Sequence, residues 1–363
     1  MVVVFGVLLT VAVTVTGRYF AITGIMAAFI PLVVCVAWRK SSKRVAILAG
    51  ILLVALVVGL TSVVTRAPKG IMTEQSKTQN LYADGGAHFC RYALGNLLPE
   101  IDQLGLGFLL MPVADPLFTQ KQASELKAWT ATIYRELEAD EAFYQLGSAM
   151  PEVYADLLGG SSQPKHAYLY IPPTLDRSKP VPALIFMHGS GGNFKAYLWL
   201  LSRLADRLSL VVLAPSCGMG NWRWLETAKI VDAAVAAAQK YVKIAPDNIH
   251  VAGLSNGGLG VCQLARDSGS RYRSLIFLSP VFDAEAVQSY AFAHECRQSK
   301  VFVLTGELDD RVPVDYVRKN AELLSRLGAT VTLEVEAQAN HFLFFSHREH
   351  MLVLLEKWIR TNQ

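Results

Sequence analysis

The sequence predicts an α/β fold, a mostly parallel sheet covered by helices on both faces, preceded by two or three transmembrane helices. Short strands that are apolar along their whole length alternate with helices over residues 165–363, which is typical of a parallel sheet. Apolar residues make up 52% of the 363-residue chain and are concentrated in residues 1–65, which predicts a membrane region. Between these two regions, residues 66–164 predict a linker and a helical lead-in or cap.

The membrane region contains three apolar runs, at residues 2–16, 19–38 and 45–64. The second and third runs each hold about 20 residues without a charge, enough for a helix to cross a hydrocarbon core of about 30 Å. The first run is shorter and resembles the core of a signal peptide in length. It lacks the basic start and the clear cleavage site of such a peptide, so we interpret it as a third, marginal span.

The basic residues predict the orientation of these spans. Arg39, Lys40, Lys43 and Arg44 lie between the second and third runs, and such a cluster marks a cytoplasmic loop. The third span then leads outward, so everything after about residue 65 is expected on the non-cytoplasmic side. Arg66 and Lys69 just beyond the third span favour the opposite orientation, but weakly. We therefore expect a multi-pass membrane protein whose N-terminal helices bind the lipid bilayer.

Residues 66–164 are the least informative part of the chain. The polar run 73–80 predicts a juxtamembrane linker. Residues 124–146 carry an apolar stripe at helical spacing beside charged residues. This helix is compatible with a cap over a site, a lead-in helix packed on the α/β domain, or an interfacial helix.

The α/β domain shows a regular order of elements. We expect strands at residues 167–171, 183–187, 210–214, 249–252, 274–278, 301–305 and 331–335, and helices at residues 193–207, 226–242, 258–266, 314–327 and 347–359. In open sheets of this kind, ligands bind beyond the carboxyl ends of the strands. Candidate functional residues are therefore sought there.

Ser255 lies in Gly253-Leu-Ser-Asn-Gly257, a G-x-S-x-G motif between a predicted strand and a predicted helix. A serine on such a sharp strand-to-helix turn is strained and exposes its Oγ above the sheet. Residues 188–192, His-Gly-Ser-Gly-Gly, follow the strand 183–187 directly. A glycine-rich turn at that place can point a backbone N–H at a developing negative charge, and Asn256 N–H would supply a second donor. The lysine and spacing of a phosphate-binding loop are missing.

Candidate partners for the serine follow two later strands. Asp309 comes after the strand 301–305 and can orient a histidine, whereas its neighbour Asp310 has the alternative of a solvated surface charge. Asp283, after the strand 274–278, is a second candidate acid. His341 follows the last strand, a loop position suited to a general base.

Four separately placed motifs resemble those of the α/β-hydrolases: His-Gly-Ser-Gly-Gly, Gly-Leu-Ser-Asn-Gly, and then an aspartate and a histidine in that chain order. The resemblance covers residues 165–363 and is closest to the carboxylesterase, dienelactone-hydrolase and polyester-depolymerase-like groups. It implies Ser255 as nucleophile, His341 as general base and acid, and Asp309 as its orienter. It also implies Ser190 or Gly191, together with Asn256, as oxyanion donors. The N-terminal third matches no pattern of this superfamily.

The expected function is that of a membrane-anchored serine hydrolase, which cleaves a small-molecule or lipid carboxylic ester through an acyl-enzyme and needs no cofactor. A serine peptidase or thioesterase is the alternative within the enzymes, because the same triad cleaves each bond. Trp222 and Trp224 are candidates for lining the substrate site, with core packing as the alternative.

Other classes fit the sequence less well. A non-catalytic binding protein has no need of a complete triad, and a transporter would place charged groups inside the apolar runs, which carry none. No basic stripe with interleaved aromatic residues is present, so no nucleic-acid partner is expected. His347 and His350 lack an acidic third ligand at useful spacing, so no metal site is predicted. Five cysteines without paired spacing favour single thiols, with one or two disulfides as the alternative in an oxidising compartment.

Overall fold

The computed structural model describes residues 1–363 except 41–42, 83–88, 160–165, 225 and 363. The chain forms two compact units. Unit 1 comprises Met1–Gly70 and Phe89–Glu136, and unit 2 comprises Ile71–His88 and Leu137–Gln363. The boundary at residues 164 and 165 lies outside the described residues.

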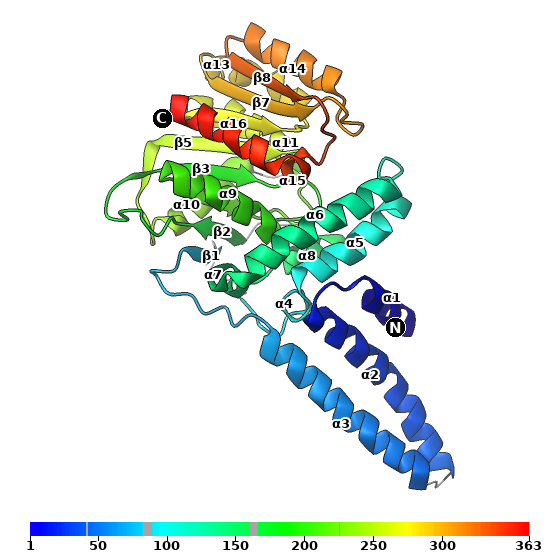
Figure 1. The fold of residues 1–363 in the computed structure, drawn as a ribbon. Coiled ribbons are helices and arrows are strands. Elements are labelled where there is room, and N and C mark those ends of the chain that lie inside the picture. The colour runs from blue at the N-terminus through cyan, green and yellow to red at the C-terminus, as the bar shows by residue number, and fades with distance from the viewer. Residues whose placement is uncertain (41–42, 83–88, 160–165, 225, 363) are drawn as a thin grey trace. The chain divides into compact units, whose positions relative to one another are not determined.

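Within the described residues, unit 2 contains an eight-stranded sheet with the strand order β1-β2-β4-β3-β5-β6-β7-β8 (Figure 1). The pairs β1–β2 and β2–β4 are antiparallel, and all later neighbours are parallel. The strands are β1 Thr78–Tyr82, β2 His166–Tyr170, β3 Val181–Met187, β4 Val211–Pro215, β5 Ile244–Leu254, β6 Ser274–Leu278, β7 Lys300–Gly306 and β8 Thr330–Glu336. The predicted mostly parallel sheet is confirmed.

Strand β1 differs from the prediction of a linker at residues 73–80. Its residues are mostly polar, but they pair with β2 from Thr78 opposite Tyr170 to Tyr82 opposite His166. As an edge strand, β1 is held by backbone hydrogen bonds and needs little apolar pattern of its own. The Asn80 side chain also donates to the carbonyl of Leu146 and contacts the His166 ring.

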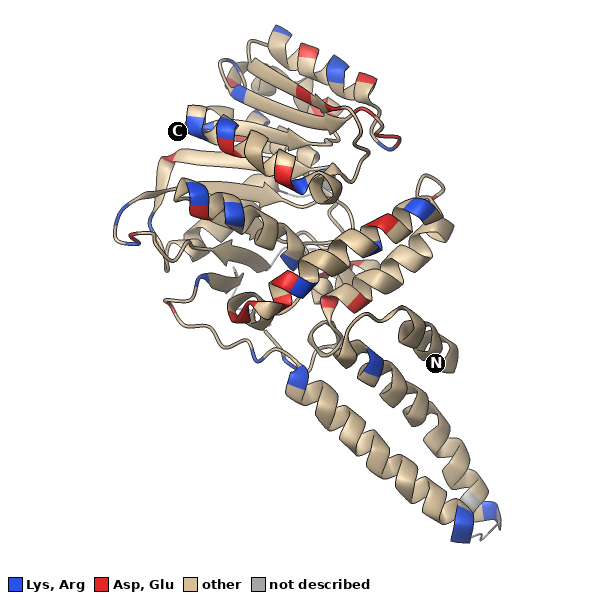
Figure 2. Ribbon diagram, in the orientation of Figure 1, with Lys and Arg blue, Asp and Glu red and all other residues tan. Residues whose placement is uncertain are grey.

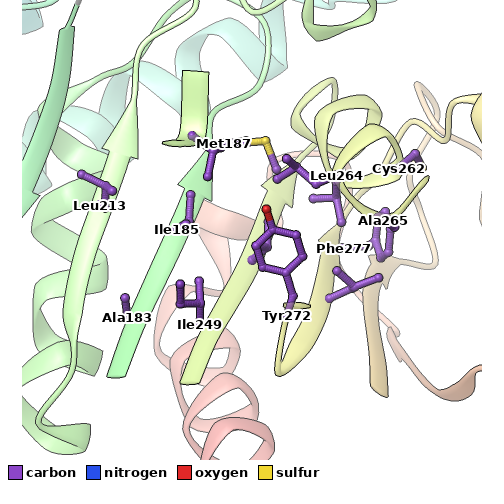
Figure 3. Packing of buried hydrophobic residues seen from close by; sticks show 14 of the residues in the cluster. Ala183, Ile185, Met187, Leu213, Ile249, Cys262, Leu264, Ala265, Tyr272 and Phe277 are labelled. Carbon is purple, nitrogen blue, oxygen red and sulfur yellow. The ribbon is translucent and has the colours of Figure 1, made fainter. Parts of the chain in front are cut away.

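Helices cover both faces of the sheet. Successive residues of each central strand point to opposite faces, so each of these strands packs against helices on both. Ala183, Ile185 and Met187 of β3 belong to one hydrophobic cluster with residues of α10, α11 and α14. Phe186, between them in sequence, packs instead on Tyr197 of α9, with ring centroids 5.4 Å apart. Figure 3 shows part of the first cluster, with β3 and β5 side chains beside Leu264 of α11.

The helices of unit 2 lie between or after these strands. They are α7 Glu141–Gln145, α8 Met150–Leu157, α9 Lys195–Leu208, α10 Thr227–Ala238, α11 Gly257–Ser268, α12 Ala284–Val287, α13 Tyr290–Glu295, α14 Val314–Arg326, α15 Leu343–Ser346 and α16 Arg348–Thr361, with short 3-10 turns at Trp222–Trp224 and Gly269–Arg271.

Unit 1 is helical in its described part. It contains α1 Val2–Val11, α2 Val15–Lys40, α3 Lys43–Arg66, α4 Leu94–Leu97, α5 Glu100–Ala114 and most of α6 Gln120–Ala139. Helices α2 and α3 lie side by side (Figure 1), and the Arg66 guanidinium at the end of α3 stacks over the Tyr19 ring near the start of α2, 5.2 Å from its centroid. The two helices therefore form an antiparallel hairpin.

Two stretches of the described residues are long and apolar enough to cross a membrane, Val15–Val36 and Lys43–Arg66. The third, marginal span predicted at residues 2–16 is not formed. Its helix α1 has 10 residues, which is about 15 Å of helix against a hydrocarbon core of about 30 Å. The chain turns between α1 and α2, where the Asp102 carboxylate of α5 accepts from the N–H groups of Val13 and Thr14.

Candidate active site

Ser255 occupies the sharp turn between β5 and α11. Its φ of +51° lies in the left-handed region, which is uncommon for any residue other than glycine. The turn is held on the neighbouring strand, because Ser255 N–H donates to the Leu278 carbonyl over 2.9 Å. The N–H of Val281 in turn donates to the Ser255 carbonyl over 3.0 Å. A strained residue fixed on both sides by backbone hydrogen bonds is typical of a functional position.

The two glycines of the motif are required by close approach of the backbone. A Cβ at Gly257 would lie 2.1 Å from the Met187 carbonyl oxygen, and one at Gly253 would lie 2.4 Å from the carbonyl oxygen of Gly257. Only glycine therefore lets α11 begin directly against the end of β3. This explains why the sequence places glycine two residues before and two residues after Ser255.

The His341 imidazole joins the serine to a carboxylate. His341 Nε2 lies 3.0 Å from Ser255 Oγ, and His341 Nδ1 lies 2.8 Å from Asp309 Oδ2. A carboxylate accepts hydrogen bonds only, so Nδ1 carries the proton and Nε2 is free to accept from the serine hydroxyl. The structure thus brings together the three residues that the sequence motifs singled out.

Asp309 is held rigidly at the end of β7. Its Oδ1 accepts from the N–H groups of Arg311 and Val312 over 3.0 and 2.8 Å, which leaves Oδ2 directed at His341. Both Asp309 and His341 are buried. A fixed, buried acceptor orients the imidazole and can stabilise the cation formed when the ring takes a proton.

The other candidate acids and histidines have different surroundings. Asp310 is exposed, and Asp283 caps α12 by accepting from the N–H groups of Glu285 and Ala286. His347 contacts its neighbour Ser346, and His350 contacts Glu336. No group of three or more metal-ligating side chains occurs in the described part of the chain.

The loop of residues 188–192, which connects β3 to α9, runs beside Ser255. A Cβ added to Gly189 would lie 3.3 Å from Ser255 Cβ. The Asn256 side-chain amide donates to Ser190 Oγ over 2.6 Å, so this loop is joined to the residue that follows Ser255. Gly191 was an alternative oxyanion donor, and here the structure corrects the prediction. Its N–H donates to the Met219 carbonyl over 2.9 Å and is therefore engaged, which leaves Ser190 as the candidate in this loop.

His188 has a structural role that its sequence position alone did not reveal. Its Nε2 accepts from the Cys217 N–H over 2.9 Å, and its Nδ1 lies 2.7 Å from the Gly189 carbonyl, to which it donates. Burial lowers the pKa of His188 to about 4, so the ring is neutral at pH 7. The neutral ring joins the 188–192 loop to the segment after β4.

Trp222 does not line a substrate site. Its side chain is completely buried in the cluster of β3, α10 and α11, and its indole N–H donates to the His188 carbonyl over 2.9 Å. The prediction of a substrate-binding Trp222 is therefore wrong, and the alternative of core packing holds. The side chain of Trp224 lies outside the described residues.

The cysteines are single thiols in the described part of the chain. Cys35 and Cys90 are exposed, whereas Cys217, Cys262 and Cys296 are buried. Burial is the main cause that raises the pKa of Cys217 to about 12, so this thiol near the 188–192 loop stays protonated. A protonated thiol is a poor nucleophile.

Sequence reasoning missed residues that hold the 188–192 loop from outside. Asp156 of α8 accepts from the Met219 N–H over 2.9 Å, and Met219 contacts the loop through Gly191. Neither residue belongs to a recognisable motif. The one usable signal was the pair of glycines around Met219, which indicates a tight turn after a strand.

The sheet, the serine turn after β5 and the loop between β3 and α9 together define the α/β-hydrolase fold. No family model matches the chain. Among curated proteins, residues of this chain match the dihydrolipoyllysine-residue acetyltransferase component of an acetoin cleaving system from Cupriavidus necator, with 34% identity over 107 residues. The match spans 29% of this chain and only 28% of that protein's length.

Solved structures with a similar fold include esterase 2 from Thermogutta terrifontis, at 17% identity and a TM-score of 0.42, which covers 54% of this chain and 89% of that one. An S-formylglutathione hydrolase from Agrobacterium tumefaciens has 15% identity and a TM-score of 0.45, and covers 55% of this chain and 90% of that one. At these scores we base the fold class on the sheet and its connections, and the function on the geometry of the site.

Proposed function

We propose that this protein is a membrane-anchored serine hydrolase that cleaves carboxylic esters. The observation that carries the proposal is the hydrogen-bonded series Ser255–His341–Asp309, with Ser255 held at φ +51° above the end of β5. A nucleophile in contact with a base, which is itself oriented by a buried carboxylate, is the arrangement that activates a serine hydroxyl.

The proposed reaction has two halves. Ser255 Oγ attacks the ester carbonyl carbon while His341 Nε2 takes the hydroxyl proton, and the carbonyl oxygen becomes an oxyanion near the N–H groups of Ser190 and Asn256. Collapse breaks the bond to the alcohol oxygen, which leaves with the proton from His341. Water then attacks the acyl-enzyme, with His341 again as base, and releases the acid and free Ser255.

The hairpin of α2 and α3 supports the membrane anchor. Tyr19 and Trp38 mark the two ends of the apolar part of α2, 19 positions apart, which is about 29 Å of helix and matches a hydrocarbon core of about 30 Å. Aromatic residues are enriched at both membrane–water interfaces. Figure 2 shows Lys and Arg at the ends of α2 and α3 and none in their middle parts. We propose that the basic end near Arg39 and Arg44 is cytoplasmic and that unit 2 lies on the other side.

The bond specificity is tested by comparing three acyl substrates with the same acyl chain and matched leaving groups: an ester, a thioester and an amide. The full-length wild type in detergent should hydrolyse the ester with the highest kcat/KM, and Ser255→Ala should lower this value by at least about 10³-fold. A kcat/KM highest for the amide or the thioester would favour a peptidase or a thioesterase. Equal, low rates for the wild type and Ser255→Ala would instead favour a binding protein.

A further inference from the structure

The 188–192 loop is held by a second loop, residues 216–221, which connects β4 to the turn at Trp222 and is called the support loop below. Two hydrogen bonds join the loops, from Cys217 N–H to His188 Nε2 and from Gly191 N–H to the Met219 carbonyl, each 2.9 Å long. They lie on either side of Ser190, whose N–H is the proposed oxyanion donor. The position of that N–H therefore depends on where the support loop lies.

The backbones of the two loops also lie so close together that no side chain fits between them at Gly220. A Cβ at Gly220 would lie 2.2 Å from the Gly189 carbonyl oxygen, and Gly220 has a φ of +91°. The 188–192 loop therefore packs directly on the backbone of the support loop. If the support loop moves, the 188–192 loop has to move with it.

Helix α8 also holds the support loop. Asp156 Oδ2 accepts from the Met219 N–H over 2.9 Å, and a Cβ at Gly218 would lie 2.7 Å from the same oxygen. Val153 precedes Asp156 by three residues, about one turn of α8, and a Cβ at Gly192 would lie 2.5 Å from its Cγ2. Helix α8 therefore contacts both loops, and Met219 is held by Asp156 through its N–H and holds Gly191 through its carbonyl.

We propose that Asp156 is a positioning residue for the oxyanion hole: it fixes Met219, which fixes Gly191, and so sets the direction of the Ser190 N–H. This inference rests on the proposed hydrolase function and assigns a role to part of the segment before the α/β domain. Asp156 touches neither the substrate nor Ser255 in this scheme. Its effect is expected on the stabilisation of the oxyanion and hence on kcat, with little effect on ground-state binding.

The test compares Asp156→Ala and Asp156→Asn with the wild type as full-length protein. Alanine removes the acceptor, so kcat should fall about ten-fold while KM changes less than about two-fold. The loss is smaller than the 10²–10³-fold cost of deleting an oxyanion donor, since the donor stays present but misdirected. Asparagine keeps an oxygen that can accept from the Met219 N–H, so its kcat should stay within about two-fold of the wild type.

Inhibition by a trifluoromethyl ketone distinguishes a positioning role from a merely structural one, because a merely structural role would leave the inhibition constant unchanged. Ser255 Oγ adds to its carbonyl carbon, the serine proton passes to His341, and the carbonyl oxygen becomes an oxyanion that needs the same donors. Its inhibition constant should rise for Asp156→Ala by the factor by which kcat falls, while the thermal midpoint stays near the wild-type value. The control variant Asp232→Ala removes a surface carboxylate paired with Arg271 and should change neither quantity.

Each outcome decides between the alternatives. An active wild type with an equally active Asp156→Ala overturns the inference and leaves the proposed function intact. A drop in kcat that is equal for the alanine and asparagine variants also overturns it. If Asp156→Ala does not fold, the asparagine variant decides, because a reduced kcat in that folded variant contradicts a role as hydrogen-bond acceptor. A wild type that neither hydrolyses esters nor binds the ketone overturns the proposed function and the inference together.

Discussion

At the scale of single residues, the candidate site depends on the direction of the His341 ring. Nδ1 faces a carboxylate and Nε2 faces a hydroxyl, and exchange of these two partners would leave the Ser255 hydroxyl without an acceptor on the ring. The direction is set by Asp309, because both of its oxygens have assigned partners. The role that we propose for the aspartate is therefore orientation, and it can be tested against its neighbour in the chain.

The substitution Asp309→Asn should lower kcat by on the order of 10³–10⁴-fold, because an amide that donates to His341 favours the wrong tautomer. Asp310→Asn changes the adjacent, exposed carboxylate and should leave kcat within about two-fold. Steady-state ester hydrolysis by the two variants gives the comparison. Equal losses in both, or no loss in Asp309→Asn, would exclude Asp309 as the orienter.

The residues of the triad were predictable because each lies in the turn or loop that follows a predicted strand, where a parallel sheet gathers side chains at one edge. The oxyanion donor proposed in the 188–192 loop was not predictable. The choice between Ser190 and Gly191 depends on a hydrogen bond to Met219, a residue 28 positions after Gly191. Trp222 was misjudged for a related reason. A tryptophan near a strand end is equally suited to a pocket and to a core, and only the burial of the side chain distinguishes them.

At the scale of the elements, the start of α11 at Gly257 lies very close to the end of β3 at Met187. Gly257→Ala would place a methyl group 2.1 Å from the Met187 carbonyl oxygen, and backbone cannot move away as a side chain could. We expect a loss of at least about 3 kcal/mol in the free energy of unfolding. The thermal midpoint of the full-length protein measures it.

Gly107→Ala is the matched control for this substitution. Gly107 lies in α5 with no atom within 4 Å of an added Cβ, so alanine should be neutral or stabilise by up to about 1 kcal/mol. A Gly257→Ala variant as stable as Gly107→Ala would contradict the close approach of α11 to β3.

Most strands and helices of unit 2 follow from their sequence pattern, but β1 and α8 do not. The central strands are buried on both faces and are therefore apolar throughout, which is easily recognised. Strand β1 lies at an edge and is polar, and α8 has only eight residues. Both are stabilised by contacts with distant segments of unit 2, such as the pairing of β1 with β2 and the contact of Asp156 with Met219. Local sequence does not encode such contacts.

At the scale of the whole molecule, three buried histidines predict how stability depends on pH. Burial lowers the pKa of His166 to about 3 and the pKa values of His188 and His250 to about 4, against 6.5 for a free histidine. Between pH 6.5 and pH 4 the unfolded chain therefore binds more protons than the folded one, and stability falls as the pH is lowered. Each histidine contributes up to about 1.4 kcal/mol per pH unit in this window.

Thermal midpoints at pH 7 and pH 5 test this prediction. The wild type should melt at a lower temperature at pH 5, and His250→Gln should show a smaller decrease because it lacks one of the three groups. A midpoint unchanged between pH 7 and pH 5 would be incompatible with neutral, buried imidazoles in the folded state.

The proposed topology is tested with an impermeant maleimide on intact cells. Cys90 is exposed and follows the two candidate spans, so the proposed topology predicts that it is labelled from outside, in a Cys35→Ala background. A cysteine placed in the basic loop by Lys43→Cys should react only after the membrane is permeabilised. The other native thiols are buried and should stay unlabelled in the folded protein. The reverse pattern would place unit 2 on the cytoplasmic side.

The most direct test of the central claim is the reaction of the full-length protein with a fluorophosphonate, followed by mass spectrometry of the intact chain and of its peptides. Ser255 Oγ should bond to phosphorus, fluoride should leave, and the serine proton should pass to His341. We predict one adduct, located on Ser255, that is absent from Ser255→Ala and formed far more slowly by His341→Ala. A folded wild type that forms no adduct, or an adduct that persists in Ser255→Ala, would contradict an activated serine at this site.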